Sequence, residues 1–329
     1  MKESKRLAWV DVAKGIAIIS VVVGHAKTPF MPFVYLYHIP VFFFISGMFT
    51  RGDSNFNVFF KAKIRSLYFP YIIVLLSMTV FHNVFVKMGM YPAFHSWQSF
   101  ATQVAKIALF GGTLSEPITY AMWFVKSLFF SEIILYWVLR LVAKWTSRFF
   151  FVSLFSLAIF FLVYGLGYHG FSHELLIPVI ALPFLLAGRF YYEVLNAMTV
   201  RFWAILLLIL VVFSFAFRID LTSLDLPNPV MYYGASFVGI FAVIGLAQTL
   251  VAVGVYRVLG AIGLCSFAIM AMHLLVFRLI TFLWVRIGRL DAASLRDVAC
   301  AGFTLNVAYI FLGVGIPVLL SHWLKRLVK

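Results

Sequence analysis

Long apolar stretches, separated by short segments that carry charges, run along most of the 329-residue chain. A stretch of roughly 20 apolar residues is long enough to cross a bilayer as a helix. Hydropathy and charge breaks predict ten such membrane spans. The predicted spans are residues 8–26, 33–50, 68–87, 119–139, 149–167, 174–191, 202–219, 231–253, 260–284 and 298–324. We therefore expect an all-α protein, a polytopic integral membrane bundle of about ten transmembrane helices.

The composition supports this fold class. Hydrophobic residues make up 64% of the chain and charged residues only 11%, whereas charged residues are about a quarter of a typical soluble domain. So little polar surface could not cover a water-soluble globule, and the lipid bilayer is the expected solvent. The sequence contains no evident internal repeat or polar appendage. We predict one domain over residues 1–329.

Most Lys and Arg residues lie at the predicted helix ends, and the chain has a net charge of +15. Membrane proteins retain basic residues on the cytoplasmic side, so this charge indicates topology and not nucleic-acid binding. Both termini are predicted to be cytoplasmic, although Arg286, Arg289 and Arg296 would then lie on the outer side. The apolar run after MKESKR could belong to a signal peptide, but Asp11 and Lys14 within it predict that it is retained.

Two features predict structure and not chemistry. In the outer segment 88–118, apolar residues recur at helix-like spacing, as at Trp97, Phe100 and Val104. This pattern predicts an amphipathic helix that lies along the membrane interface or covers the bundle. In the second span, Ser46 and Gly47 form a small-residue notch, which predicts close packing against another helix.

The first predicted span contains three ionisable residues, Asp11, Lys14 and His25. Charges inside a membrane span are costly and normally face a partner or a wet cavity. At about 100° and 1.5 Å per residue, Lys14 and His25 lie on one helix face, roughly 16 Å apart. Asp11 precedes Lys14 by three positions, a spacing that permits an ion pair. Because histidine exchanges protons near neutral pH, this face predicts a functional element.

The first two spans carry the motifs WVDVAKGIAIISVVVGH and YHIPVFFFISGMF, and later segments carry KAKIRSLYFPY, WFVKSLF and IGLCSFAIMAMH. Together these motifs resemble the membrane acyltransferase-3 family, particularly its fucose 4-O-acetyltransferase-like branch. The resemblance implies a ten-helix enzyme of the bacterial cytoplasmic (inner) membrane. Such an enzyme moves an acyl group, usually acetyl, from acyl-CoA to a hydroxyl of a cell-surface carbohydrate. The family's spacing of a basic residue and a histidine corresponds to Lys14 and His25.

The resemblance implies acetyl-CoA as the acyl donor. Its nucleotide end is polyanionic and cytoplasmic, so it needs Lys or Arg at the inner face. The predicted donor-binding residues are Lys14 and three inner-loop residues, Lys61, Lys63 and Arg65, which stand where the family has an arginine motif. The positive-inside bias explains the three loop residues equally well. The roughly 16 Å from Lys14 to His25 is comparable with an extended pantetheine arm.

The predicted catalytic residues are His25, Asp11 and His38. His25 could remove the proton from a sugar hydroxyl, or could itself become transiently acylated. We expect Asp11 to position Lys14. His38 precedes Pro40 at the outer start of the second span, and we expect it to bind the acceptor or to orient His25. Its alternative role is that of an interfacial histidine.

Four further residues are predicted to bind substrate, namely Trp123, Lys126, Glu132 and His273. Three of them have a structural alternative. Trp123 could belong to an aromatic belt at the membrane interface. Glu132 needs a partner inside lipid, such as a basic residue at the cytoplasmic end of the predicted bundle. His273 is equally well explained as a core histidine that bonds a backbone carbonyl.

The sequence leaves one rival function open, a transporter or flippase for a lipid-linked or small polar substrate, which would use the same charged groups as a relay. For the transferase, the expected partners are the acyl-CoA donor, a carbohydrate acceptor and the bilayer, with no nucleic acid. An oligomer is left open. Cys265 and Cys300 lie in apolar segments without metal-ligand spacing, so we expect buried thiols and no metal.

Overall fold

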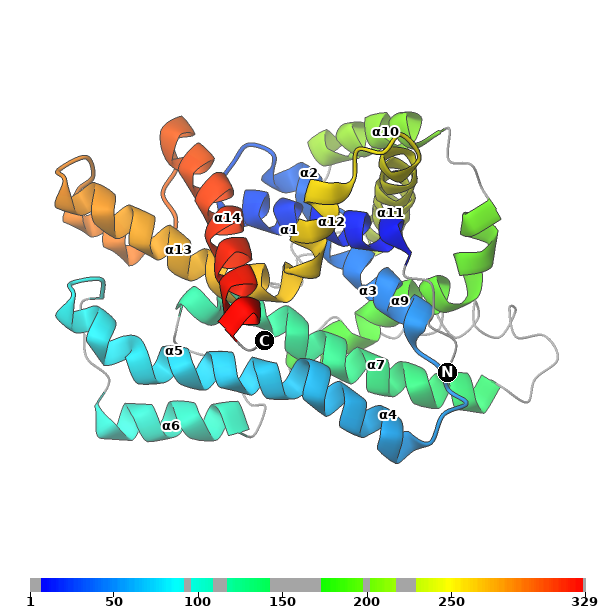
Figure 1. Cartoon of the computed structure of the whole chain (residues 1–329), viewed down its shortest axis with the longest axis horizontal. Coiled ribbons are helices and arrows are strands. Elements are labelled where there is room, and N and C mark those ends of the chain that lie inside the picture. Colours follow the sequence, from blue (N-terminus) through cyan, green and yellow to red (C-terminus); the bar gives the residue numbers. More distant parts are fainter. Residues whose placement is uncertain are drawn as a thin grey trace. The chain divides into compact units, whose positions relative to one another are not determined.

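The computed structural model describes residues 7–91, 96–108, 117–142, 173–197, 202–216 and 229–327. Within these ranges the chain is helical and contains no strand (Figure 1). The long helices of the membrane spans are α1 (Ala8–His25), α3 (His38–Phe49), α5 (Phe69–Lys87), α7 (Trp123–Val142), α11 (Pro229–Ala252), α13 (Ser266–Arg286) and α14 (Phe303–Leu327). The other helices are α2 (Met31–Tyr35), α4 (Phe56–Lys63), η1 (Ile64–Tyr68), α6 (Trp97–Ala108), η2 (Pro117–Met122), α9 (His173–Ala197), α10 (Trp203–Ala216), α12 (Arg257–Leu264) and η3 (Ala292–Arg296).

Seven segments of the described ranges are long and apolar enough to cross a membrane, and each corresponds to one predicted span. They are Ala8–His25, Met31–Phe49, Phe56–Lys87, Pro117–Leu141, Val230–Ala252, Ser266–Arg286 and Phe303–Leu327. The predicted spans 174–191 and 202–219 coincide with shorter apolar helices, and the span 149–167 lies outside the described residues. The all-α membrane class is therefore supported, while the count of ten spans and the cytoplasmic termini stay predictions.

The predicted third span, 68–87, coincides with α5, but the loop predicted before it is wrong because helical structure begins at Phe56. α4 continues through the π-helical segment η1 directly into α5. Phe59 of α4 is buried and its ring stacks on Tyr136, with ring centroids 4.7 Å apart. This aromatic contact stabilises a helix in a segment whose charges indicated a loop. Lys61, Lys63 and Arg65 accordingly lie in helices, with Lys61 and Arg65 exposed to the outside of the fold.

Two other predicted spans differ from the helices of the structure, and the backbone conformation explains both differences. The predicted span 260–284 is divided into α12 and α13 at Cys265, whose φ of −103° and ψ of 11° leave the helical region. The predicted span 298–324 begins only at Phe303. Gly302 precedes it with a φ of +147°, a conformation that glycine tolerates and that a helix cannot contain.

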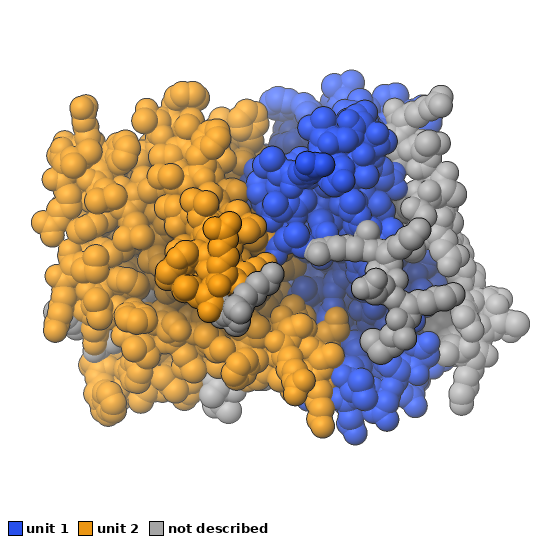
Figure 2. Space-filling model, in the orientation of Figure 1, with its two compact units in different colours: residues 1–21, 32–60, 127–264 blue, residues 22–31, 61–126, 265–329 orange. Residues whose placement is uncertain are grey.

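One compact unit, called unit 1, consists of residues 1–21, 32–60 and 127–264 (Figure 2). In it α3 packs along α9, and α11 packs against α3 and α10. Gly47 of α3 and Gly188 of α9 contact each other's helix: a Cβ atom on Gly47 would lie 2.0 Å from the Leu185 carbonyl oxygen. A Cβ atom on Gly188 would lie 1.9 Å from the Phe44 carbonyl oxygen. The predicted packing role of Gly47 is confirmed.

The same kind of contact joins α1 to α12 within unit 1. A Cβ atom on Gly15 would lie 2.1 Å from the carbonyl oxygen of Leu259, and one on Gly263 would lie 1.9 Å from that of Asp11. The two backbones can approach this closely only because both residues lack a side chain. The contact holds α1 at the level of Asp11 and Gly15, next to Lys14.

A second compact unit, called unit 2, consists of residues 22–31, 61–126 and 265–329 (Figure 2). In it α13 packs along α14 and against η2 and η3, and α5 packs against α6 and η2. Figure 1 shows α6 alongside α5. α6 is the helix that the spacing of Trp97, Phe100 and Val104 predicts, and its helical structure is confirmed. Its location at the membrane interface stays a prediction.

We predict that Gly263→Ala destabilises the protein while Gly260→Ala does not. Both glycines belong to α12, but a Cβ atom on Gly260 meets nothing within 4 Å. The added methyl group at position 263 forces two backbones apart, at a cost of about 1–3 kcal/mol or more. At position 260 alanine gains up to about 1 kcal/mol of helix propensity. Thermal unfolding in detergent measures both variants, and equal midpoints would contradict the α1–α12 contact.

Candidate active site

Two histidines predicted to act on substrate lie together in unit 2. His25 is the last residue of α1 and His273 lies in α13, and their ring centroids are 5.2 Å apart with an angle of 41° between the planes. The His273 side chain has no exposed surface, whereas His25 is half-buried. The fold therefore brings the histidine of the first motif to the histidine of the last one.

Hydrogen bonding defines the tautomer of His273. Its Nδ1 atom lies 2.8 Å from the carbonyl oxygen of Ile269, and a carbonyl can only accept, so Nδ1 carries the proton. The neutral ring then has its lone pair on Nε2, which is buried and has no hydrogen-bond partner among the described residues. A buried acceptor without a donor is costly. The structural alternative for His273, a fully satisfied core histidine, thus accounts for Nδ1 and not for Nε2.

The chain beyond His25 is held in place by the segment that precedes α14. Lys27 has a left-handed φ of 52°, and its Nζ atom forms an ion pair with Asp297 at 2.6 Å. The Thr28 hydroxyl donates to the Val23 carbonyl, 3.0 Å away, which closes the end of α1. These contacts fix the direction in which the chain leaves the histidine pair.

Arg278, which the sequence analysis did not select, anchors the same segment from α13. Its side chain is 2% exposed, and it donates to the backbone carbonyls of Leu295 and, at 2.8 Å, Asp297. Its guanidinium carbon also lies 4.3 Å from the centroid of the Tyr91 ring, a cation–π contact. Arg278 falls inside the predicted span 260–284, so the rule that drew attention to Lys14 would have identified it.

Hydrogen bonds between hydroxyl groups also join α13 to α14. The hydroxyls of Thr281 and Tyr309 are 2.6 Å apart, and the Tyr309 hydroxyl accepts from the backbone N–H of Cys300 at 3.2 Å. Cys265 is buried, but Cys300 is half-buried, which corrects the expectation that both thiols are buried. This network makes α13, α14 and the segment between them one support for His273.

Glu132 of α7 is buried in unit 1 and accepts a hydrogen bond from the Ser46 hydroxyl of α3. Ser46 therefore binds a carboxylate in addition to lying in the packing notch that was predicted for it. A hydroxyl donor lowers the cost of a carboxyl group inside a membrane span. The predicted pairing of Glu132 with a basic residue stays a prediction.

His38 begins α3 in unit 1 and is 7% exposed. Its Nδ1 atom lies 2.6 Å from the Val34 carbonyl oxygen, and its ring centroid is 5.1 Å from that of Tyr35. As in His273, this bond places the proton on Nδ1 and the lone pair on Nε2. The two roles predicted for His38, to bind the acceptor or to orient His25, stay predictions.

The remaining predicted residues are distributed between the two units. Asp11 and Lys14 are half-buried in the part of α1 that belongs to unit 1. Trp123 and Lys126 begin α7 in unit 2, directly after η2, and Lys126 is 7% exposed. Lys63 is half-buried in unit 2. The ion pair of Asp11 with Lys14 and the binding roles of these residues stay predictions.

Comparison with known proteins identifies the family. The family model described as an acyltransferase domain matches residues 7–324, nearly the whole chain. The chain belongs to the acyltransferase-3 family. Curated proteins and solved structures gave no match. The match includes both His25 and His273, so the paired histidines lie within the acyltransferase domain. Together with the apolar helices, it makes this chain a multi-pass membrane protein of an acyltransferase family.

We predict that Arg278→Met destabilises this acyltransferase, because two backbone carbonyls lose their buried donor. Each unsatisfied carbonyl costs about 1–3 kcal/mol. Arg286→Met is the matched control: Arg286 is exposed and its hydrogen bond to the Met88 carbonyl is long, 3.3 Å. Thermal unfolding and limited proteolysis between residues 287 and 302 report the effect. If both variants unfold and are cleaved alike, Arg278 does not anchor the segment.

Proposed function

We propose that the chain is a membrane O-acyltransferase of the fucose 4-O-acetyltransferase-like branch. It moves acetyl from cytoplasmic acetyl-CoA to a sugar hydroxyl of a cell-surface polysaccharide or lipid-linked glycan, in the bacterial inner membrane. The observation that supports this function best is the close pair of His25 and His273 within a matched acyltransferase domain. Two imidazoles in contact can take a proton from a hydroxyl and return it to a leaving group.

In the direct route His25 acts as a general base. It accepts the proton of the sugar hydroxyl while the oxygen attacks the thioester carbonyl carbon. The tetrahedral intermediate then breaks its carbon–sulfur bond, and the CoA sulfur takes the proton from the His25 imidazolium. In the covalent route His25 attacks the thioester first, and the sugar hydroxyl then displaces the acyl group from the imidazole. Both routes leave an acetyl ester, free CoA and an unchanged enzyme.

His273 supports either route through its Nε2 lone pair. This atom is buried beside His25, and a second hydroxyl of the acceptor sugar, next to the one that His25 deprotonates, would supply the donor that it needs. Because Nδ1 is bound to Ile269, the ring keeps one orientation and one tautomer. His273 thus serves as a substrate-binding residue that holds the sugar so that its reacting hydroxyl lies at His25.

The donor would be bound along α1. Lys14 and His25 belong to one continuous helix and are separated by eleven positions, about 16 Å of rise. This length suits a thioester that reaches His25 while its nucleotide stays at the inner face with Lys61, Lys63 and Arg65. Asp11 would orient Lys14. For the acceptor we propose Trp123, Lys126 and Glu132, with His38 as a further acceptor-binding or orienting residue.

The transporter alternative is less well supported. A relay of charged groups through a cavity would explain why Asp11, Lys14 and His25 lie inside a membrane span. It does not explain why nearly the whole chain matches an acyltransferase family. Family membership therefore favours group transfer.

We predict that His25→Ala lowers acetyl transfer by about 100-fold or more, the range expected for loss of a general base. Purified protein in nanodiscs, labelled acetyl-CoA and a panel of sugar acceptors measure the reaction. His322→Ala is the matched control: His322 also bonds a backbone carbonyl through Nδ1, at 2.9 Å from Val318, but is exposed on α14. It should transfer acetyl at the wild-type rate. Both variants should unfold at the wild-type temperature.

Transfer retained in His25→Ala would exclude His25 from the chemistry. His273→Asn should retain the fold and lose part of the transfer rate, because its amide can still donate to the Ile269 carbonyl but has no acceptor where Nε2 lies. A wild-type protein that consumes no acyl-CoA with any acceptor, yet moves solute across liposomes, would establish the transporter instead.

A further inference from the structure

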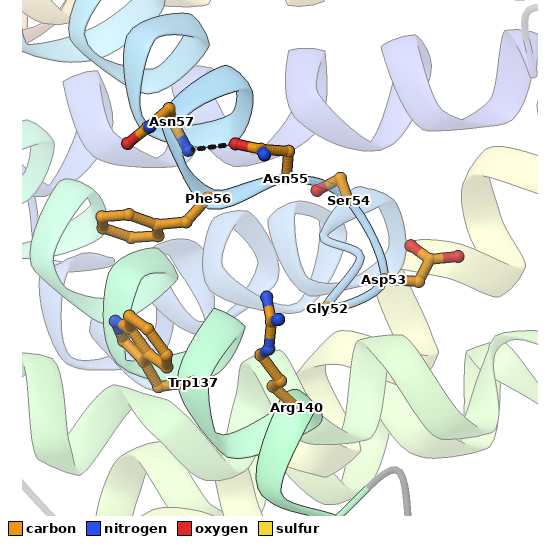
Figure 3. A pocket seen from close by; sticks show the side chains of 8 residues that line it. All are labelled: Gly52, Asp53, Ser54, Asn55, Phe56, Asn57, Trp137 and Arg140. Atoms are coloured by element: carbon orange, nitrogen blue, oxygen red, sulfur yellow. Dashed lines mark hydrogen bonds between the residues drawn. The ribbon is translucent and has the colours of Figure 1, made fainter.

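A polar pocket of about 650 Å³ lies in unit 1, between the loop that precedes α4 and the last turns of α7 (Figure 3). Its volume falls within the range of small-molecule sites, about 300–1,000 Å³. The pocket is lined by Gly52, Asp53, Ser54, Asn55, Phe56, Asn57, Trp137 and Arg140. None of these residues has a role in the acyl transfer described above.

Internal contacts hold the loop in a defined shape. The Tyr136 hydroxyl donates to the Ser54 carbonyl at 2.6 Å, and Arg140 donates to the Tyr136 hydroxyl at 2.9 Å. Gly52 lies so close to α7 that a Cβ atom on it would be 2.8 Å from the Leu139 Cβ atom. The Asn55 side chain accepts from the backbone N–H of Asn57 at 2.9 Å, where α4 begins. The pocket is therefore formed before any ligand binds.

The lining of the pocket includes a guanidinium group, from Arg140, and an indole ring, from Trp137. In Figure 3 the Arg140 guanidinium points toward the loop, while the Asp53 carboxylate lies to the side of it. Arg140 is exposed and forms no ion pair among the described residues, so its guanidinium is available to an anion in the pocket. Trp137 is 46% exposed although its ring centroid lies 5.2 Å from that of Phe56. A nucleobase can stack on an exposed indole ring, and a phosphate can bind a guanidinium group.

The chemistry of the rim agrees with such a ligand. The side-chain amides of Asn55 and Asn57 and the Ser54 hydroxyl can both donate and accept, as the edge of a nucleobase or a ribose requires. α4 begins at the pocket with Phe56, and the first turn of a helix favours negative charge. The predicted topology also places this loop and the end of α7 on the cytoplasmic side, where acyl-CoA is present.

We propose that this pocket binds the adenosine 3′,5′-phosphate end of acyl-CoA, with the adenine stacked on Trp137 and a phosphate on Arg140. The inference rests on the proposed function, which supplies acyl-CoA as the donor. It adds Arg140 and Trp137 to the donor-binding residues proposed above and assigns to these two the adenine and one phosphate. The guanidinium gives the bidentate phosphate contact that a lysine does not.

The experiment measures binding of adenosine 3′,5′-bisphosphate to the full chain in nanodiscs of zwitterionic lipid, by calorimetry. Arg140→Gln should weaken binding about tenfold or more, since a charge-assisted contact to phosphate is lost. In turnover it should raise the KM for acetyl-CoA by a similar factor and leave kcat unchanged. Arg289→Gln, at an exposed position of unit 2, should bind as the wild type does.

Tyr136→Phe separates ligand binding from loop support. It removes the hydroxyl that joins Arg140 to Ser54 but leaves the guanidinium, so its binding should weaken much less than that of Arg140→Gln. Equal losses in the two variants, or unchanged binding in Arg140→Gln, would overturn the proposal. Wild-type protein that transfers acetyl but does not bind the bisphosphate would also overturn it, without harm to the proposed function. Protein that binds the bisphosphate through Arg140 but never transfers acetyl would instead refute the function.

Discussion

The interior of a bilayer offers no hydrogen-bond partners, so every polar side chain in a membrane span must find one within the protein. This constraint organises both units. In unit 1 the carboxyl of Glu132 joins α7 to α3 through Ser46. In unit 2 the guanidinium of Arg278 joins α13 to the segment before α14. Nε2 of His273 is one exception, since it is buried beside His25 and has no hydrogen-bond partner among the described residues. That exception coincides with the place where a substrate hydroxyl is needed.

Helix packing in lipid lacks the hydrophobic driving force that operates in water, and close backbone approach replaces it. The α3–α9 and α1–α12 contacts are both pairs of glycines, each set against the partner's carbonyl oxygen. For α1 the contact lies beside Lys14, so the helix that carries Asp11, Lys14 and His25 is held by its backbone.

Much of the fold could be predicted from the sequence, because apolar length and charge breaks are local properties. The breaks at Cys265 and Gly302 could not, since they depend on backbone conformations that hydropathy does not report. The cost of an intramembrane charge led directly to His25, and the same rule applied to residue 278 would have found Arg278. The meeting of His25 with His273 required the packing of distant helices. The nucleotide pocket left no signal, since its residues resemble an ordinary helix end and loop.

The central claim is that His25 carries acetyl transfer to a surface sugar. Mass spectrometry of surface glycans from native host cells tests it most directly, with the intact gene compared with a His25→Ala allele expressed at the same level. The account predicts that one glycan species loses the mass of an acetyl group in the His25→Ala cells and regains it when the intact gene is restored. Identical acetylation in both cell lines would contradict the account.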